Sequence, residues 1–124
     1  MADRCPRAKC LGRAWIEDYG FRWRKWADIE ISRDEYTVGV VWQLDDEELS
    51  KLDEFEHYPT HYFRQRVIIQ RSQDTMTGWA YMMTNQDFQE LPSDSYLLLL
   101  QQGYDENDLS TEQLDRALER LVKK

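Results

Sequence analysis

Residues 44–64 place a short helix between two strand-like segments, and this arrangement limits the possible folds more than any other part of the sequence. A β-type run ends directly before Asp45, whose carboxylate can cap the first turn of a helix, and Glu48 completes a capping box. Pro59 cannot continue the helix, because it lacks a backbone N–H and forces the preceding residue out of the α region. The pattern predicts a helix that starts after Asp45 and has Glu56 in its last turn or just beyond it.

The position of Glu56 at the end of this helix has chemical consequences. Free carbonyl groups at a helix C-terminus raise the pKa of a nearby carboxylate, and partial burial against Phe55, Tyr58 and Tyr62 would raise it further. A glutamate whose pKa approaches neutrality is a good general base and then a good acid. Most carboxylates of acidic helices are simply solvated, so the spacing alone favours a solvated Glu56 over a catalytic one.

Strand-like patterns account for most of the other residues before position 85. The segments are 11–17, 21–26, 27–32, 36–44, 62–71 and 76–84, of which 27–32 is either a short strand or an irregular link. Polar turns are predicted at 18–20, 33–35 and 72–74, because their Asp, Ser, Gly and Gln residues interrupt the alternation of apolar and polar side chains. The last two strands are therefore predicted to form a hairpin.

Residues 21–26 alternate aromatic and basic side chains, which is one way to stack nucleic-acid bases. The chain has 16 Lys and Arg residues against 24 Asp and Glu residues, and its net charge of −8 opposes binding to a phosphate backbone. We therefore predict a half-buried strand with cation–π contacts at 21–26, and we expect no nucleic-acid partner.

Two helices are predicted after the hairpin. Ser93 can cap a helix that runs to Gln102, with Gly103 as its C-terminal stop. Residues 97–100 are four consecutive leucines, so this helix is apolar all round and is expected to be well buried against the sheet.

Ser110 is expected to begin the last helix, with Gln113 completing a capping box. Its apolar side chains recur at helical spacing and predict one buried stripe. The stripe consists of Leu114, Ala117, Leu118, Leu121 and Val122.

The length and the order of these elements indicate one α+β domain over residues 1–124. A chain of 124 residues can bury a hydrophobic core. An aromatic content of 13% opposes disorder, although the mean hydropathy is −0.80. Strands that come first, with helices interposed or late and with hairpin-length turns, are typical of the α+β class.

The cysteines and histidines do not form a recognisable metal site. Cys5 and Cys10 are the only cysteines, and their spacing is not that of a zinc half-site. With no signal peptide and no apolar run long enough to span a membrane, we expect two reduced thiols in a cytoplasmic protein with no membrane partner. His57 and His61 are four residues apart, but Pro59 breaks the helix that would pair them, so two unrelated loop histidines are the favoured interpretation.

Several motifs, taken in order, resemble the γ-glutamylcyclotransferase-like family. Leu52-Asp53-Glu54-Phe55-Glu56, followed by Tyr58-Pro59 and Tyr62-Phe63-Arg64, is similar to the family segment Leu-Asp-x-x-Glu-Gly…Tyr-x-Arg. The other matching pieces are Arg4-Cys5-Pro6-x-Ala8, Gly12-x-Ala14, Val38-Gly39-Val40-Val41, Pro92-Ser93-x-x-Tyr96 and Gly103. Two features depart from the family: His57 stands where Gly is usual, and the opening strand that ends in Tyr-Gly-Ser-Asn is absent.

The resemblance implies a fold and a reaction. The expected fold is a small, curved, mostly antiparallel β-barrel of about six strands with flanking helices, closed or nearly closed. The expected reaction is an intramolecular aminolysis, in which the α-amine of a γ-glutamyl amine, amino acid or peptide attacks its own γ-carbonyl. The products are 5-oxoproline and the released amine, and the reaction uses a small-molecule substrate with no metal or other cofactor.

The resemblance also assigns roles to individual residues. Glu56 matches the family's single general base and acid, and Tyr62 and Tyr96 match positions that line the substrate cavity. Either tyrosine could instead belong to the core. Asp53 lies three residues before Glu56, where it could form a carboxylate dyad, although capping or orienting a backbone group is favoured. Ser93 has no histidine near it in sequence and is predicted to be a helix cap rather than a nucleophile.

A second class of function stays open, namely a non-catalytic binding or assembly domain that kept the fold and lost the substrate loop. In the family, that loop supplies the donors for the oxyanion, so we expect residues 1–124 to lack the family's N-terminal part and to have little activity alone. Strand edges left unpaired by the missing strand would be covered most simply in a two-fold homodimer.

Overall fold

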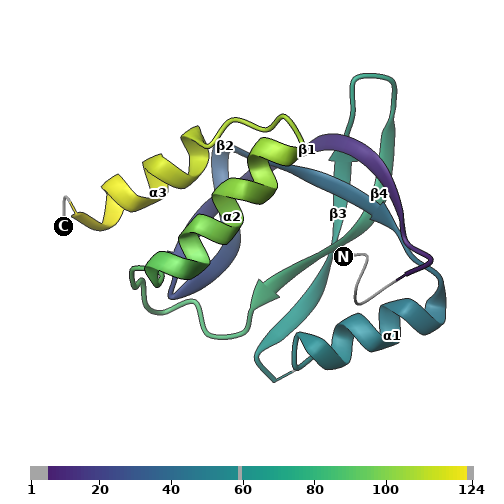
Figure 1. Ribbon diagram of the computed structural model, residues 1–124, viewed down its shortest axis with the longest axis horizontal. Coiled ribbons are helices and arrows are strands. Elements are labelled where there is room, and N and C mark those ends of the chain that lie inside the picture. Colours follow the sequence, from purple (N-terminus) through teal and green to yellow (C-terminus); the bar gives the residue numbers. More distant parts are fainter. Residues whose placement is uncertain (1–5, 59, 123–124) are drawn as a thin grey trace.

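The computed structural model describes residues 6–58 and 60–122 of the chain, which form one curved sheet and three helices (Figure 1). The elements in chain order are β1 (Lys9–Arg24), β2 (Trp26–Gln43), α1 (Asp46–Phe55), β3 (Tyr62–Gln70), β4 (Thr75–Met83), α2 (Asp94–Glu106) and α3 (Glu112–Val122). The sheet is antiparallel in the order β2-β1-β3-β4. These features confirm the α+β class.

The first two strands are longer than the sequence pattern predicts. β1 and β2 form one continuous hairpin that reverses at Lys25, which has a φ of 67°. The turns predicted at 18–20 and 33–35 are wrong, because both segments lie inside strands. Asp18 and Asp34 adopt φ values of 65° and 69°, and the register shifts at Asp18, so these residues bend the ribbon without ending it.

The hairpin predicted from residues 62–84 is confirmed. β3 and β4 pair without a register shift from Tyr62 opposite Met83 to Gln70 opposite Thr75. The connection is closed by Arg71, whose backbone N–H donates to the carbonyl oxygen of Asp74 at 2.9 Å and whose side chain forms an ion pair with the Asp74 carboxylate at 2.6 Å.

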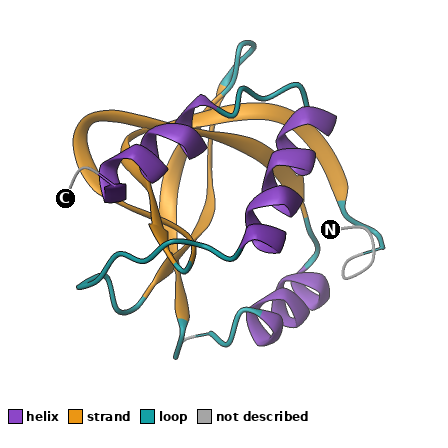
Figure 2. Cartoon of the chain, turned by 60° about the vertical axis from the view of Figure 1, so that its left-hand side comes forward, coloured by secondary structure: helices purple, strands orange, loops and turns teal. Residues whose placement is uncertain are grey.

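The described residues do not form the expected closed or nearly closed barrel of about six strands. They make a curved open sheet of four strands, in which β2 and β4 are the two edges (Figure 2). At one end, a side chain joins these edges where no strand ladder does, because the Met83 N–H donates to Asp28 Oδ1 at 2.7 Å. Beside it, the hydroxyl of Tyr62 on β3 donates to the carbonyl oxygen of Ala27 on β2 at 3.0 Å. Curvature therefore brings the edges together locally without closing the sheet.

Helix α1 has the boundaries that its capping residues predict. The Glu48 N–H donates to Asp45 Oδ1 at 2.7 Å, so Asp45 is the N-cap. The helix ends at Phe55, and Glu56 is the C-cap residue. Leu52 is buried on the face of α1 that packs toward the sheet.

Helix α2 differs from its prediction at its end and in its burial. Ser93 caps the helix as expected, but α2 continues through Gly103 to Glu106. The Asn107 side-chain amide donates to the carbonyl oxygen of Gly103 at 2.8 Å, so asparagine rather than glycine completes the C-terminus. The predicted deep burial is wrong, because Leu98 and Leu99 are 55% and 64% exposed.

Helix α3 packs its apolar stripe against β1. Trp23 is completely buried, and its indole N–H donates to the carbonyl oxygen of Leu114 at 3.2 Å. The apolar residues in or around this cluster include Ala117, Leu118 and Leu121, which confirms the described part of the stripe. Helix α3 starts at Glu112, and Ser110 lies just before it, where its Oγ accepts from the Glu112 N–H at 3.1 Å.

Gln113 joins α3 to the edge of the sheet instead of closing a capping box. Its Oε1 accepts from the Val38 N–H at 2.9 Å, and its Nε2 donates to the Val38 carbonyl oxygen at 3.0 Å. The side-chain amide thus satisfies both backbone groups of a residue on the edge strand β2, as a neighbouring strand would. The capping-box interpretation of Gln113 is therefore wrong.

We expect Gln113→Ala to lower the free energy of unfolding by about 1–3 kcal/mol, because it leaves the Val38 N–H and carbonyl group without partners. Urea denaturation measures the change. Gln102→Ala, on the exposed side of α2, is the matched control and should change stability by about 0.5 kcal/mol or less. Equal effects of the two substitutions would contradict the role given to Gln113.

Candidate functional site

Glu56 lies at the C-terminus of α1, where the chain leaves the helix in a well-defined turn. The Tyr58 N–H donates to the Asp53 carbonyl oxygen at 2.9 Å, and the His57 N–H donates to the Glu54 carbonyl oxygen at 3.1 Å. These two bonds form a Schellman motif, in which the residue after the cap adopts a left-handed conformation. His57 holds that position with a φ of 55°.

This backbone conformation explains why the family usually has glycine at the position that His57 occupies in this chain. A left-handed residue other than glycine costs free energy, because its Cβ approaches the backbone. We expect His57→Gly to raise the free energy of unfolding by about 1 kcal/mol. His57→Ala, which removes the imidazole but keeps the Cβ, should give no such gain. Urea denaturation of both variants tests this, and equal stability of the two would contradict it.

Asp53 holds two side chains of the neighbouring hairpin one turn before Glu56. Its Oδ1 accepts from the Tyr81 hydroxyl at 2.5 Å and lies 3.1 Å from Arg64 Nε. Neither of the roles considered for Asp53, a carboxylate dyad or the capping of a backbone group, describes these contacts. Burial and the hydrogen bond to Asp53 raise the pKa of Tyr81, so its hydroxyl stays protonated as a donor.

The two tyrosines predicted from the sequence meet at one residue of β2. The Tyr62 hydroxyl donates to the Ala27 carbonyl oxygen at 3.0 Å, and the Ala27 N–H donates to the Tyr96 hydroxyl oxygen at 3.4 Å. Burial raises the pKa of Tyr62, and the charge of Glu56 raises it further. The fold thus brings Tyr62 from β3 and Tyr96 from α2 together, and places Tyr62 within the electrostatic field of Glu56.

A buried ion pair supports this arrangement, and the sequence pattern did not indicate it. The side chains of Arg24 and Asp28 are 2% and 0% exposed and lie 2.8 Å apart. Asp28 also accepts from the Met83 N–H at 2.7 Å and from Gln86 Nε2 at 3.1 Å. Burial raises the pKa of Asp28. Because Asp28 follows Ala27, the network fixes the strand that both tyrosines contact.

The segment 21–26 is buried through ion pairs more than through cation–π contacts. Arg22 is 4% exposed and pairs with Glu35 at 2.6 Å, while Lys25 lies over the ring of Trp26 at 5.0 Å. Within this segment, the cation–π contact is therefore the one between Lys25 and Trp26. The sequence did contain a signal for these ion pairs, because arginines on a half-buried strand need carboxylate partners.

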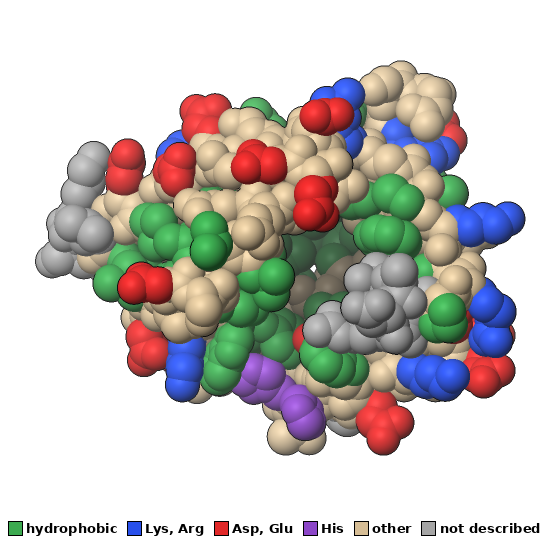
Figure 3. All heavy atoms as spheres, in the orientation of Figure 1, with side chains coloured by type: hydrophobic (Ala, Val, Ile, Leu, Met, Phe, Trp, Pro, Cys, Tyr) green, Lys and Arg blue, Asp and Glu red, His purple; other side chains and the backbone are tan. Residues whose placement is uncertain are grey.

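An apolar hollow of about 580 Å³ lies on the inner face of the curved sheet, against α1. Figure 3 shows a hollow with hydrophobic walls near the centre of that view. Its lining includes Ala14, Ile16, Leu52, Val67, Ile69, Met76, Ala80 and Tyr81, and none of the described residues that line it is charged. Leu52 and Tyr81 connect this hollow to the part of α1 that carries Asp53 and Glu56.

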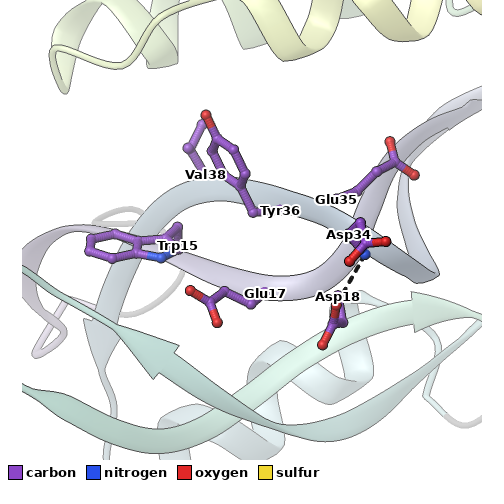
Figure 4. A pocket seen from close by; sticks show the side chains of 7 residues that line it. All are labelled: Trp15, Glu17, Asp18, Asp34, Glu35, Tyr36 and Val38. Carbon is purple, nitrogen blue, oxygen red and sulfur yellow. Dashed lines mark hydrogen bonds between the residues drawn. The ribbon is translucent and has the colours of Figure 1, made fainter.

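A second cavity of about 540 Å³ lies beside the bend in the β1–β2 hairpin (Figure 4). Trp15 and Tyr36 line it together with four carboxylates, and the Asp34 N–H donates to Asp18 Oδ1 at 3.2 Å. Within the part of the chain that the structure describes, no group of three or more His, Cys, Asp or Glu side chains is arranged to hold a metal ion. This acidic cavity is separate from the residues around Glu56.

Other features of the sequence can also be placed. None of the helices in the described residues is sufficiently long and apolar to cross a membrane. Cys10 is exposed with a free thiol, whereas Cys5 lies outside the described residues. The ring of His61 packs edge-on against the rings of Trp26 and Tyr62, with 4.9 Å between ring centres in each case. His57 is the left-handed residue after α1. The two histidines thus have separate structural roles.

Comparison with known proteins gives a consistent result at the level of sequence. The sequence model of one family, described as "Gamma-glutamyl cyclotransferase, AIG2-like", matches residues 2–98. A Drosophila melanogaster protein named as a candidate gamma-glutamylcyclotransferase is 40% identical over 48 residues. That match covers 38% of this chain and 31% of the relative, so it spans less than a third of the relative's length.

Solved structures agree with the family match. A gamma-glutamyl cyclotransferase has a TM-score of 0.79 and 25% identity, with 94% of this chain and 76% of that chain covered. An uncharacterized protein from Homo sapiens has the same TM-score and coverage with 26% identity. A protein from Arabidopsis thaliana shares the fold, with a TM-score of 0.62 and 21% identity over 85% of this chain and 68% of that one. Because the family match extends over most of the chain, the chain belongs to the gamma-glutamyl cyclotransferase, AIG2-like family.

Proposed function

We propose that the protein converts a γ-glutamyl amine, amino acid or peptide to 5-oxoproline and the released amine, with Glu56 as general base and acid. Family membership supports the class of reaction. The observation that carries the proposal is the position of Glu56, half-buried at the C-terminus of α1 and close enough to Tyr62 and Tyr81 for its charge to raise the pKa of both hydroxyls.

The reaction needs one group that moves two protons. The α-amine nitrogen attacks the γ-carbonyl carbon, a new C–N bond closes the five-membered ring, and Glu56 takes a proton from the attacking nitrogen. The bond to the leaving nitrogen then breaks, and Glu56 returns the proton to that nitrogen. The Tyr62 and Tyr81 hydroxyls donate to the Ala27 carbonyl oxygen and to Asp53, which fixes their positions. Tyr62 and Tyr96 are the proposed substrate contacts.

The test is release of 5-oxoproline by the full-length protein from a panel of γ-glutamyl amines, amino acids and peptides. We expect release from at least one of these three classes without added metal or nucleotide. Binding of γ-glutamyl compounds without any release would contradict the proposal and would favour a non-catalytic binding domain.

A further inference from the structure

The guanidinium group of Arg64 is held in a fixed orientation beside the candidate site. Its Nε lies 3.1 Å from Asp53 Oδ1, and its central carbon lies 5.1 Å from the ring centre of Tyr58 and 4.8 Å from that of Trp79. The side chain is 20% exposed. Aromatic rings and a carboxylate together fix the plane of a guanidinium and reduce the entropy lost when it binds a ligand.

Among the described residues, the outer edge of this guanidinium has no partner. Within residues 6–58 and 60–122, neither terminal nitrogen of Arg64 makes a hydrogen bond or an ion pair. Buried arginines of the same fold behave differently, since the terminal nitrogens of Arg24 donate to Asp28 and to the Gln86 carbonyl oxygen. Two parallel N–H groups at the edge of a fixed guanidinium match the geometry of a carboxylate.

Arg64 contacts the part of the chain that carries Glu56. Asp53 contacts Arg64 and is three residues before Glu56, a spacing that places side chains about 5–6 Å apart at Cβ on one side of a helix. Burial and Asp53 raise the pKa of the Tyr81 hydroxyl, the positive charge of Arg64 lowers it, and the charge of Glu56 raises it. Asp53 thus joins Arg64 and Tyr81, and it lies one helical turn before Glu56.

The chemistry of a γ-glutamyl group requires a base and a carboxylate-binding group that lie next to each other. Its α-amine and its α-carboxylate are attached to the same carbon atom, so a base that takes a proton from the amine must lie next to whatever binds the carboxylate. We propose that Arg64 binds the α-carboxylate of the γ-glutamyl group and thereby selects substrates that carry it. This inference rests on the proposed function of Glu56 as the base.

Arg66 provides a matched control for this role. Its guanidinium lies 4.4 Å from the ring centre of Trp79, on the same face of the β3–β4 hairpin as Arg64. It is exposed and, among the described residues, has no ion pair with a carboxylate. Arg64→Gln and Arg66→Gln therefore remove the same charge from the same aromatic ring, but only the first changes the group beside Asp53.

Binding experiments test the recognition of the carboxylate directly. The two probes are 5-oxoproline and 2-pyrrolidinone, which has the same ring without the carboxylate, and binding is followed by NMR titration. We expect the unmodified protein to prefer 5-oxoproline by about tenfold or more, as charge-assisted bidentate hydrogen bonds allow. Arg64→Gln should reduce this preference to about twofold or less, Arg64→Lys should retain part of it, and Arg66→Gln should keep it.

Turnover provides a second measure of the preference for the α-carboxylate. A 4-aminobutanoyl amide lacks the α-carboxylate and would cyclise to 2-pyrrolidinone, so its rate is compared with that of the corresponding γ-glutamyl amide. Each ratio is taken within one variant, which cancels any difference in the folded fraction. A preference for the carboxylate that survives in Arg64→Gln, or that is absent from the unmodified protein, would overturn the role of Arg64. Lost preference in the binding experiment without any turnover would contradict the proposed reaction but support Arg64 as the carboxylate contact.

Discussion

Glu56→Gln is expected to reduce 5-oxoproline release by the full-length protein about a hundredfold or more, with little loss of binding. Glutamine has nearly the same shape as glutamate, but its amide cannot take a proton from the attacking amine or return one to the leaving nitrogen. The rate should fall in kcat, while the affinity for 5-oxoproline in an NMR titration should change by no more than about threefold.

Glu54→Gln is the control for this experiment. Glu54 is exposed on the same helix, two residues before Glu56, and the substitution removes the same charge. We expect its rate to stay within about twofold of the unmodified protein. Near-normal release by Glu56→Gln, or an equal loss in both variants, would show that the carboxylate of Glu56 does not carry the proton transfers.

Arg24→Met is expected to lower the free energy of unfolding by about 3–5 kcal/mol, because it leaves the completely buried Asp28 without its cationic partner. Methionine fills much of the volume of arginine, so the loss should come mainly from the uncompensated charge. Lys51→Met is the matched surface control. Lys51 is 57% exposed and lies 3.6 Å from Glu47, and loss of such a pair should cost about 0.5 kcal/mol or less.

The deficit caused by Arg24→Met should depend on pH. Burial already raises the pKa of Asp28, and the positive charge of Arg24 opposes that shift, so removing the arginine raises the pKa further. A carboxyl group with a raised pKa in the folded protein stabilises the fold when protonated, and this contribution is lost as the pH rises through the folded-state pKa. The difference from the unmodified protein should therefore shrink as the pH falls from 7 toward 4. A deficit that grows on acidification would contradict this explanation.

Local signals in the sequence were sufficient to predict helix α1 and the β3–β4 hairpin. Asp45 caps α1 through an N–H only three residues away, and Pro59 and the polar residues 72–74 act on their immediate neighbours. Such interactions depend on short stretches of chain, so the order of residue types is enough to indicate them. The same local pattern placed Glu56 at the end of the helix.

The continuity of β1 and β2 could not be predicted in this way. Asp18 and Asp34 have the residue type of a turn, and each adopts the left-handed conformation that a turn uses. They lie close together across one ladder, where the Asp34 N–H donates to Asp18, and the pairing on both sides carries the strands through the bend. Strand pairing over the whole hairpin therefore outweighs the local turn preference.

The side-chain network of the candidate site was decided by the tertiary structure. The sequence by itself determined that a glutamate follows a capped helix and that Tyr62 and Arg64 begin the next strand. Only the folded chain brings Tyr81 and Arg64 to Asp53, and joins Tyr62 and Tyr96 through Ala27. The Tyr81–Asp53 and Ala27–Tyr96 bonds join residues 28 and 69 positions apart. Contacts over such separations depend on sheet curvature and helix packing, which no local pattern of residue types encodes.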